Sequence, residues 1–341
     1  MNPVPTAAGR ASMNDVAALA GVSAQTVSRV ANAHPRVLPE TRERVLEAMR
    51  TLGYRPNSAA RNLKSGRFRS VGFVTFNLTT LGNKRTLDAV ASAAGAAGYT
   101  TTLLSIADPT QLDVVGAFSR LEEQAVDGII LVMSAEVGPV DQLTITAGLP
   151  VVVVDSDAIL PYPIVDTDQE GGTTLAIEHL IGLGHRDIVH VSGPASSYSA
   201  RRRADMYRRL VVERGLRDRE VLVGDWSAQS GLAIGRAIMQ SGSIPTAVFA
   251  ANDQMALGLL KAVHEHGLRV PEDISVVGFD DSDEAIAFWP ALTTVHQNFD
   301  AVGRKATDIL LSLIHGREVV HETQLIATSL VVRDSTGPVP G

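Results

Sequence analysis

The sequence predicts an α/β protein in which a small helical head precedes a larger body built from parallel sheets. From Ser70 onward, short apolar runs alternate with amphipathic helical stretches, which is the pattern of βαβ units. The first 69 residues hold 11 of the 30 Lys and Arg but only 4 of the 37 Asp and Glu, which leaves 19 against 33 in the rest. This basic head on an acidic body indicates that the head meets a polyanion.

The composition is that of an ordinary globular chain. The 341 residues are 45% hydrophobic and 20% charged, and this length favours two or three domains. No uncharged apolar run is long enough to cross a membrane, and residues 1–12 lack the apolar segment of a secretory signal. The absence of cysteine excludes disulfides and Cys nucleophiles. We therefore expect a cytoplasmic protein with no membrane partner.

The head begins with two short helices joined by a tight turn. Ser12 with Asp15 matches the capping box that starts a helix, and Gly21 supplies the left-handed residue that ends it. Ser23 can then cap a second helix over residues 24–32. Two helices joined in this way have the proportions of a helix-turn-helix.

A third and a fourth helix complete the head. An amphipathic stretch runs from about Pro39 to Leu52, and Pro39 is a good first helical residue although Leu38 offers no side-chain cap. Asn57 can cap a short helix that ends near Leu63. This segment is too short to be stable alone, so it should order only against a partner.

The body contains seven strand-like runs, which exceed one comfortable sheet, so we expect two subdomains. These runs cover residues 70–76, 100–105, 128–133, 150–155, 187–192, 246–251 and 274–280. The helical stretches between them include residues 86–98, 171–184, 204–215 and 252–267.

Several stretches of the chain resemble the LacI/GalR (lac-repressor-like) family of bacterial transcription regulators. The resemblance lies in DVAALAGVSAQTVSRV at residues 15–30, in residues 41–66, and in the body motifs GDWSA and ANDQMALG, and it extends from about Ser12 to Thr336. It implies a helix-turn-helix head, a hinge helix, and a periplasmic-binding-protein-like core of two subdomains with doubly wound parallel sheets. It also implies a homodimeric repressor of carbohydrate-utilisation genes that binds pseudo-palindromic double-stranded operator DNA.

By this resemblance the second helix enters the major groove, where Ala24, Gln25 and Arg29 read base edges. Gln25 can pair with adenine and Arg29 with guanine, whereas Ala24 can make only an apolar contact. The hinge helix lies in the minor groove, where Leu63 wedges between base pairs. The other predicted DNA-binding residues, of which the first four are phosphate contacts, are Ser23, Thr26, Ser28, Asn32, Asn57 and Arg61.

Polar residues follow several of the strand-like runs, and ligands of open α/β sheets sit at the carboxyl ends of strands. Carboxylates and amides bind paired hydroxyls, a guanidinium donates two fixed bonds, and an aromatic ring covers the apolar face of a sugar. The resemblance implies a neutral sugar effector in the cleft between the subdomains. The predicted effector-binding residues are Phe76, Asp155, Arg203, Trp226, Asn252, Asp280, Gln297 and Phe299.

Two alternatives stay open. One is a sugar-binding protein of the same core fold without a DNA role, which would need an export signal and no basic head. The other is a regulator whose effector is a sugar phosphate or a nucleobase acting as corepressor, because Lys84 and Arg85 can reach a phosphate. No P-loop is present, the G-x-G at residues 182–184 precedes a strand, and His264 and His266 cannot face one metal from a helix. We therefore expect no enzyme, no cofactor and no metal site.

The resemblance also implies the domain boundaries. The helix-turn-helix domain covers residues 1–56, and the hinge helix with its linker covers 57–69. The core N-subdomain comprises 70–167 and 298–326, and the C-subdomain comprises 168–297 and 327–338. The tail has no leucine heptads, so we expect a dimer rather than a tetramer.

Overall fold

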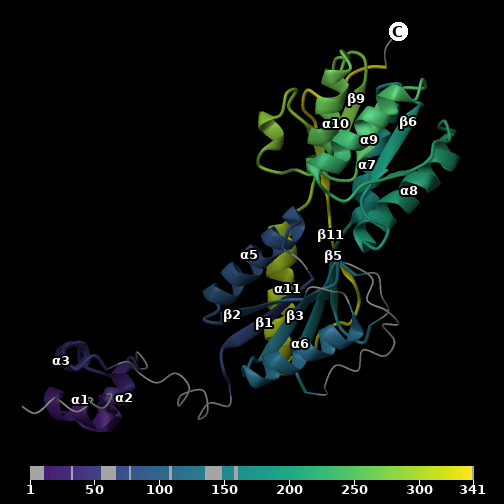
Figure 1. Cartoon of the computed structure of the whole chain (residues 1–341). Coiled ribbons are helices and arrows are strands. Elements are labelled where there is room, and N and C mark those ends of the chain that lie inside the picture. The colour runs from purple at the N-terminus through teal and green to yellow at the C-terminus, as the bar shows by residue number, and fades with distance from the viewer. Residues whose placement is uncertain are drawn as a thin grey trace, which may run out of the picture. The chain divides into compact units, whose positions relative to one another are not determined.

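The computed structural model describes residues 11–31, 34–54, 67–76, 78–106, 110–134, 148–156 and 160–339. The chain forms two compact units, Met1–Phe68 and Arg69–Gly341, which are the head and the body (Figure 1). No helix within the described ranges combines the length and the apolar character that a membrane span requires.

The head has three helices, α1 (Met13–Ala20), α2 (Ala24–Ala31) and α3 (Pro39–Thr51). The predicted capping box is confirmed, because the Asp15 backbone donates to Ser12 Oγ and the Ser12 backbone donates to the Asp15 carboxylate. Gly21 has the predicted left-handed conformation, with φ at 64°. Leu38 precedes α3 without a side-chain cap, as expected. The helices enclose a small core of Val16, Ala17, Ala20, Val27, Val30, Val45, Ala48 and Met49.

The first sheet of the body has six parallel strands in the order β11-β5-β4-β3-β1-β2. These strands are β1 (Ser70–Thr75), β2 (Thr100–Ser105), β3 (Gly128–Val132), β4 (Val151–Val154), β5 (Ile164–Thr167) and β11 (Gln324–Ile326). The helices packed on them are α5 (Leu81–Ala96), α6 (Gln111–Glu123) and α11 (Phe299–Ile314). Alternate residues of β1 face opposite layers, since Phe73 packs with α5 and α11 while Val74 packs with α6.

The second sheet has six strands in the order β12-β10-β9-β8-β6-β7. These strands are β6 (Ile188–Ser192), β7 (Leu222–Val223), β8 (Ala247–Ala250), β9 (Ser275–Asp280), β10 (Thr293–His296) and β12 (Ser329–Val331). A short 3-10 turn, η2 (Ala285–Ala287), follows β9. Helices α7 (Gln169–Gly182) and α8 (Tyr198–Arg214) cover one face, and α9 (Ala228–Gln240) and α10 (Asp253–Glu265) cover the other.

The chain passes between the two sheets three times. The crossing segments are residue 168 between β5 and α7, residues 297–298 between β10 and α11, and residues 327–328 between β11 and β12. Because strands and helices alternate in both sheets, the α/β class with two subdomains is confirmed.

All seven strand-like runs contain a strand, but five short strands (β5, β7, β10, β11 and β12) were not predicted. One of them, β12, runs antiparallel to β10. The expectation of wholly parallel sheets is therefore wrong for this strand of the second sheet. These five strands have two to four residues each, which give too little periodicity to be recognised locally.

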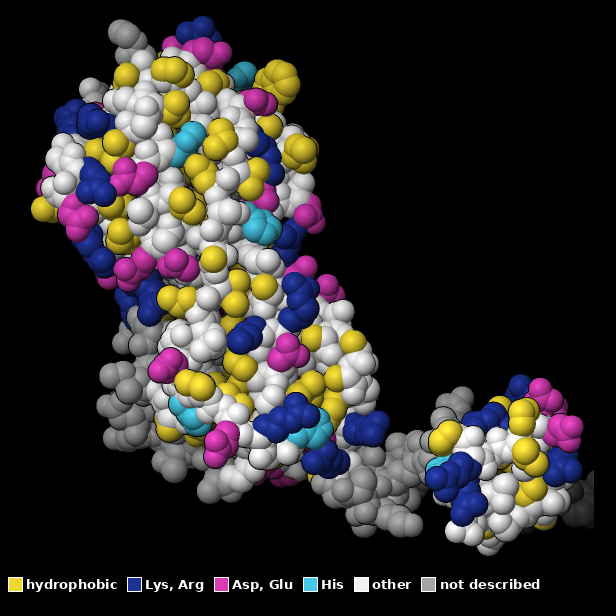
Figure 2. Space-filling view, turned by 180° about the vertical axis from the view of Figure 1, so that it is seen from behind, with side chains coloured by type: hydrophobic (Ala, Val, Ile, Leu, Met, Phe, Trp, Pro, Cys, Tyr) yellow, Lys and Arg dark blue, Asp and Glu magenta, His cyan; other side chains and the backbone are white. Residues whose placement is uncertain are grey.

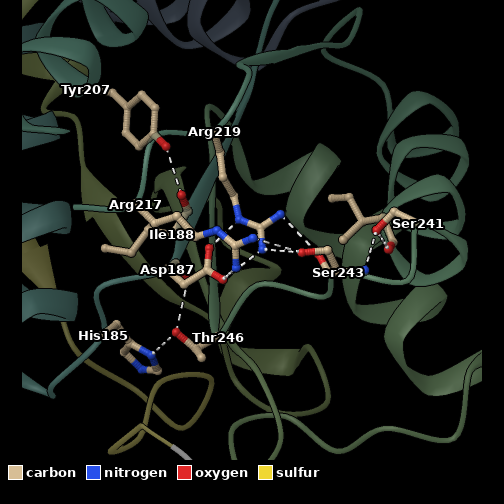
Figure 3. Close-up of polar contacts among 10 residues, drawn as sticks. His185, Asp187, Ile188, Tyr207, Arg217, Arg219, Ser241, Ser243 and Thr246 are labelled. Carbon is tan, nitrogen blue, oxygen red and sulfur yellow. Dashed lines mark hydrogen bonds and ion pairs between the residues drawn. The ribbon is translucent and has the colours of Figure 1, made fainter.

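A network of ion pairs and hydrogen bonds holds the end of the second sheet that faces away from the strands' carboxyl ends (Figure 3). Asp187, just before β6, accepts hydrogen bonds from Arg219 and, at 3.0 Å, from Arg217. Thr246 donates to the Asp187 carbonyl and contacts His185 at 3.0 Å. Burial raises the pKa of Asp187, but the hydrogen bonds and charges of the two arginines outweigh it and hold the pKa below its ordinary value. The network ties the loop after α8 to the start of the sheet.

Candidate ligand pocket and nucleic-acid interface

A cavity of about 610 Å³ lies at the carboxyl ends of the strands of both sheets. Its wall includes residues from the first turns or caps of six helices, α5, α7, α8, α9, α10 and α11. Helix N-termini present backbone N–H groups that have no partner within the helix. The volume is typical of a small-molecule site, and polar groups that converge on such a site fix the orientation of the ligand.

Seven of the eight predicted effector-binding residues line this cavity. They are Asp155, Arg203, Trp226, Asn252, Asp280, Gln297 and Phe299. Phe76 is not among the lining residues, because its side chain packs in the core beside α6 with Val74 and Ile106. An aromatic ring just after a buried strand is stabilised more by joining the apolar core than by facing a polar cavity.

Arg203 is the buried cation of the pocket. Its Nε donates to Oε1 of Gln169 at 2.8 Å, and its Nη1 donates to the carbonyl of Ala251. The guanidinium carbon lies 3.7 Å from the centroid of the Phe279 ring and 5.7 Å from that of Trp226. Hydrogen bonds and ring contacts together hold a charged side chain that is only 3% exposed.

Trp226 owes its position to two neighbours. A Cβ atom on Gly193 would lie 2.3 Å from the indole Cζ2, so only glycine permits the observed packing there. The side-chain amide of Asn252 donates to the Trp226 carbonyl at 2.9 Å, and its Oδ1 accepts from the Met255 backbone as the cap of α10. Asn252 therefore positions the indole in addition to lining the cavity.

Two aspartates occupy neighbouring positions on adjacent strands. Parallel pairing places Val154 beside Val165, so Asp155 and Asp166, the next residues, stand side by side at the cavity. Asp166 is buried and pairs with Arg202 at 3.2 Å. Burial and the charge of Asp155 raise the pKa of Asp166 to about 8.

Asp280 is the anion on the opposite wall. Its Oδ1 accepts from Nε2 of Gln297 at 2.6 Å. Burial raises the pKa of Asp280 to about 6, and the charge of Arg203 opposes this rise. Burial conversely lowers the pKa of Arg203, and the charge of Asp280 opposes that change.

Sequence reasoning missed several residues that line the cavity. They are chiefly Asp166, Gln169, Asp225, Gln254 and Glu284, together with the serines at 196, 197 and 199. The first two follow a run of only two apolar residues, Ile164 and Val165, which is too short to be recognised as a strand. The serines surround the start of α8 in the stretch GPASSYS, with Ser199 in its first turn, and small hydroxyl residues at a helix start were an available signal.

The described residues that line the cavity carry more negative than positive charge. The carboxylates are those of Asp155, Asp225, Asp280 and Glu284, and the cations are Lys84 and Arg203. Asp166 adds a carboxyl group whose raised pKa keeps it protonated at neutral pH. Arg85, which was considered for a phosphate, pairs with Asp283 at 2.5 Å instead. Across the described ranges, no three His, Asp or Glu side chains gather in a way that would hold a metal ion.

Helix α2 of the head presents polar side chains on one face. Val27 and Val30 are buried against the other helices, while Gln25 and Arg29 are exposed four residues apart. Ser23 caps the helix by accepting from the Thr26 backbone at 3.2 Å, so Ser23 has a local structural role as well. Figure 2 shows Lys and Arg side chains standing on the visible face of the head.

The other predicted DNA-binding residues divide into two groups. Ala24, Thr26 and Ser28 are half-buried on α2. Four fall outside the described residues, and these are Asn32, Asn57, Arg61 and Leu63.

Comparison with known proteins is consistent with both units. Residues 12–57 match the model of bacterial regulatory proteins of the lacI family, and residues 177–336 match a periplasmic binding protein-like domain. The chain is 36% identical over 326 residues to the lactose operon repressor of Escherichia coli (strain K12), covering 94% of this chain and 89% of that one. It is 34% identical over 336 residues to the HTH-type transcriptional regulator CelR of Thermobifida fusca, covering 96% and 98%.

Solved structures agree with these matches. The lac repressor dimer bound to operator and the anti-inducer ONPF superposes with a TM-score of 0.87 at 35% identity, covering 96% of this chain and all of that one. The complex of the regulator CelR with cellobiose gives a TM-score of 0.72 at 32% identity, covering 96% and 100%. The chain belongs to the lacI family of bacterial regulatory proteins.

Proposed function

We propose that this protein is a repressor that binds a two-fold symmetric operator as a dimer. Its affinity for the operator changes when a neutral sugar binds in the cavity. The observation that carries the proposal is one chain holding both parts, a helix-turn-helix head with Gln25 and Arg29 exposed and a cavity built around the buried Arg203. We propose that it acts in the cytoplasm, because that is where operator DNA of a bacterium lies.

The cavity supports a sugar through three kinds of group. Asp155 and Asp280 offer carboxylate acceptors, Arg203 offers donors, and Trp226 offers an aromatic face. The relatives bind compatible ligands, since CelR is seen with cellobiose and the lac repressor with ONPG.

A sugar phosphate fits this wall less well. The excess of carboxylates among the described lining residues would repel a phosphate, and Arg85 is engaged by Asp283. A nucleobase is the stronger second candidate because its flat ring can stack on the indole of Trp226.

Exposed apolar side chains on the second subdomain support dimerisation. Trp289 is 96% exposed and follows η2, where Ile286 is 70% exposed. Leu257 lies on α10 and is 42% exposed. Buried residues of α10 belong to the same core cluster as Ala285 of η2. Large apolar residues left open to water mark a candidate surface for another chain, and we propose a second copy.

Operator binding with and without candidate effectors tests this function. A preferred duplex is first selected from a library of two-fold symmetric sequences, and its Kd is measured by fluorescence anisotropy with cellobiose, ONPG, glucose 6-phosphate, adenine and guanine. We expect a neutral sugar to change the Kd by about 5-fold or more, the range typical of allosteric coupling.

The variant Arg203→Ala separates the two units in this assay. It should bind the duplex as the wild type does but lose the response to sugar, because the head does not contain the pocket. A response to the phosphate or to a nucleobase alone would replace the sugar assignment, and the absence of any preferred duplex would refute the repressor itself.

A further inference from the structure

Four buried polar side chains of the cavity are joined by one line of hydrogen bonds, which we call the glutamine relay. Arg203 Nε donates to Gln169 Oε1 at 2.8 Å, Gln169 Nε2 contacts Gln297 Oε1 at 3.5 Å, and Gln297 Nε2 donates to Asp280 Oδ1 at 2.6 Å. Each of the four residues is at most 7% exposed. The relay therefore joins the buried cation of the pocket to a buried anion through two neutral amides.

The orientation of both amides is fixed by the ends of the relay. A guanidinium only donates, so the oxygen of Gln169 must face Arg203. An ionised carboxylate only accepts, so the nitrogen of Gln297 must face Asp280. The nitrogen of Gln169 is then left opposite the oxygen of Gln297, and the middle contact is complementary without any further adjustment.

The middle contact of the relay also joins the start of α7, directly after one crossing segment, to a second crossing segment. Gln169 is the first residue of α7, directly after the crossing residue that follows β5. Gln297 lies between β10 and α11 in the second crossing segment. At 3.5 Å this contact is the longest of the three and sits at the limit of a hydrogen bond, so a small shift of one segment relative to the other breaks or strengthens it.

We propose that Gln169 is a positioning residue of the pocket, which sets the guanidinium of Arg203 directly and the carboxylate of Asp280 through Gln297. Because Gln169 directly follows one crossing segment and Gln297 lies in another, Gln169 also couples ligand contacts to the relative position of the subdomains. Because protein groups hold Nε and Nη1 of Arg203 and Oδ1 of Asp280, recognition of a ligand falls mainly to Nη2 of Arg203 and Oδ2 of Asp280. The proposal rests on the ligand-binding function proposed for the cavity, to which it adds a residue.

The first test needs no ligand. Full-length protein labelled with [¹⁵N]arginine shows the Arg203 Nε–H resonance, identified by its loss in Arg203→Lys. We expect this resonance to exchange with water at least about tenfold faster in Gln169→Met, which removes the acceptor, and to stay protected in Gln169→Glu, which keeps it. Gln240→Met, on the exposed end of α9, is the matched control and should leave the resonance unchanged.

Unchanged protection in Gln169→Met would overturn the proposal. Because Gln169→Glu keeps the acceptor and pairs with Arg203, it remains informative if the methionine variant folds poorly, and loss of protection in this folded variant would equally contradict the relay.

The second test measures coupling with cellobiose and ONPG as probes. Gln169→Met should weaken sugar binding by at least about tenfold, since the guanidinium loses its support. Gln169→Glu cannot donate to Gln297, so at saturating sugar its ratio of operator Kd values with and without sugar should move toward one. Wild-type sugar affinity and wild-type ratios in both variants would refute the role of Gln169. If wild-type protein binds neither probe, the sugar proposal fails, while the exchange measurement still decides the relay.

Discussion

Single residues in unusual backbone conformations shape the pocket. Asp155, Trp226 and Asp280 have positive φ values of 56°, 73° and 121°, a region that residues other than glycine rarely adopt. Such strain persists only where the surroundings hold it in place. Asn252 supplies that support to the backbone of Trp226, whereas Gln297 holds the side-chain carboxylate of Asp280. The position of Trp226 at the cavity therefore depends on a neighbour whose hydrogen bond fixes the backbone behind it.

The raised pKa of Asp166 predicts a pH dependence of stability. The folded state holds this proton up to about pH 8, whereas the unfolded chain releases it near pH 4, so unfolding is opposed most at low pH and stability falls as the pH rises between these values. Asp166→Asn stays neutral throughout. Urea unfolding should give similar free energies for both proteins at pH 5. At pH 8.5 the variant should be the more stable by several kcal/mol, because about three pH units separate pH 5 from the raised pKa.

The matched control for this measurement is Asp88→Asn, at an exposed position of α5, whose curve should run parallel to that of the wild type. If the free energy of unfolding of Asp166→Asn also changes with pH as that of the wild type does, Asp166 is ionised in the folded protein at neutral pH. Its pairing with Arg202 then outweighs burial.

Two substitutions on α2 should differ in effect, because one changes the preference for an operator sequence and the other changes the affinity for every duplex. Gln25→Ala removes an exposed amide able to pair with adenine, so it should reduce the discrimination between the selected operator and one of its single-base variants by about 1–3 kcal/mol. Ser28→Ala should instead weaken all duplexes alike, as loss of a phosphate contact does. Measured Kd values on the same set of duplexes distinguish the two. Uniform weakening by Gln25→Ala would contradict base reading.

At the scale of elements, glycines allow α9 and α10 to pack backbone against backbone. A Cβ atom on Gly258 would lie 2.1 Å from the carbonyl oxygen of Ala228, and one on Gly231 would lie 2.2 Å from that of Met255. Helices this close keep the start of α10, with its cap Asn252, beside Trp226. The packing of these two helices therefore helps to position Asn252 and Trp226 at the pocket.

Gly258→Ala should lower the free energy of unfolding by about 1–3 kcal/mol, because the added methyl group forces the two helices apart. Gly116→Ala, in the middle of α6 where a Cβ meets no atom within 4 Å, should instead raise it by about 0.5–1 kcal/mol through helix propensity. Chemical denaturation of both variants decides the matter, and equal effects would show that the close approach of α9 and α10 carries no energy.

At the scale of the whole molecule, the proposed regulator depends on two copies acting together. Two-fold symmetric operators are read by two heads, so a surface that brings two bodies together controls DNA affinity without touching DNA. The apolar residues around η2 and α10 are the candidates for this surface.

Trp289→Glu should shift the protein toward monomer in analytical ultracentrifugation and weaken operator binding by about tenfold or more, because a buried charge without a partner opposes association. Val212→Glu is the matched control, since Val212 is also exposed, at 82%, but lies on α8 away from η2. A Trp289→Glu variant that dimerises as the wild type does would move the interface elsewhere.

Much of the architecture could be predicted because its causes are local. The capping box at Ser12, the turn at Gly21 and the seven long apolar runs depend on neighbours in sequence, and Asp155 and Asp280 were identified because each follows such a run. The tertiary structure alone decided the short edge strands, the burial of Phe76 in the core, and the positions of Asp166 and Gln169 at the cavity. Each of these depends on partners more than 25 residues away in the chain, such as Arg202 for Asp166 and Arg203 for Gln169. Sequence periodicity records which face a residue presents, whereas only folding determines which distant side chain it meets.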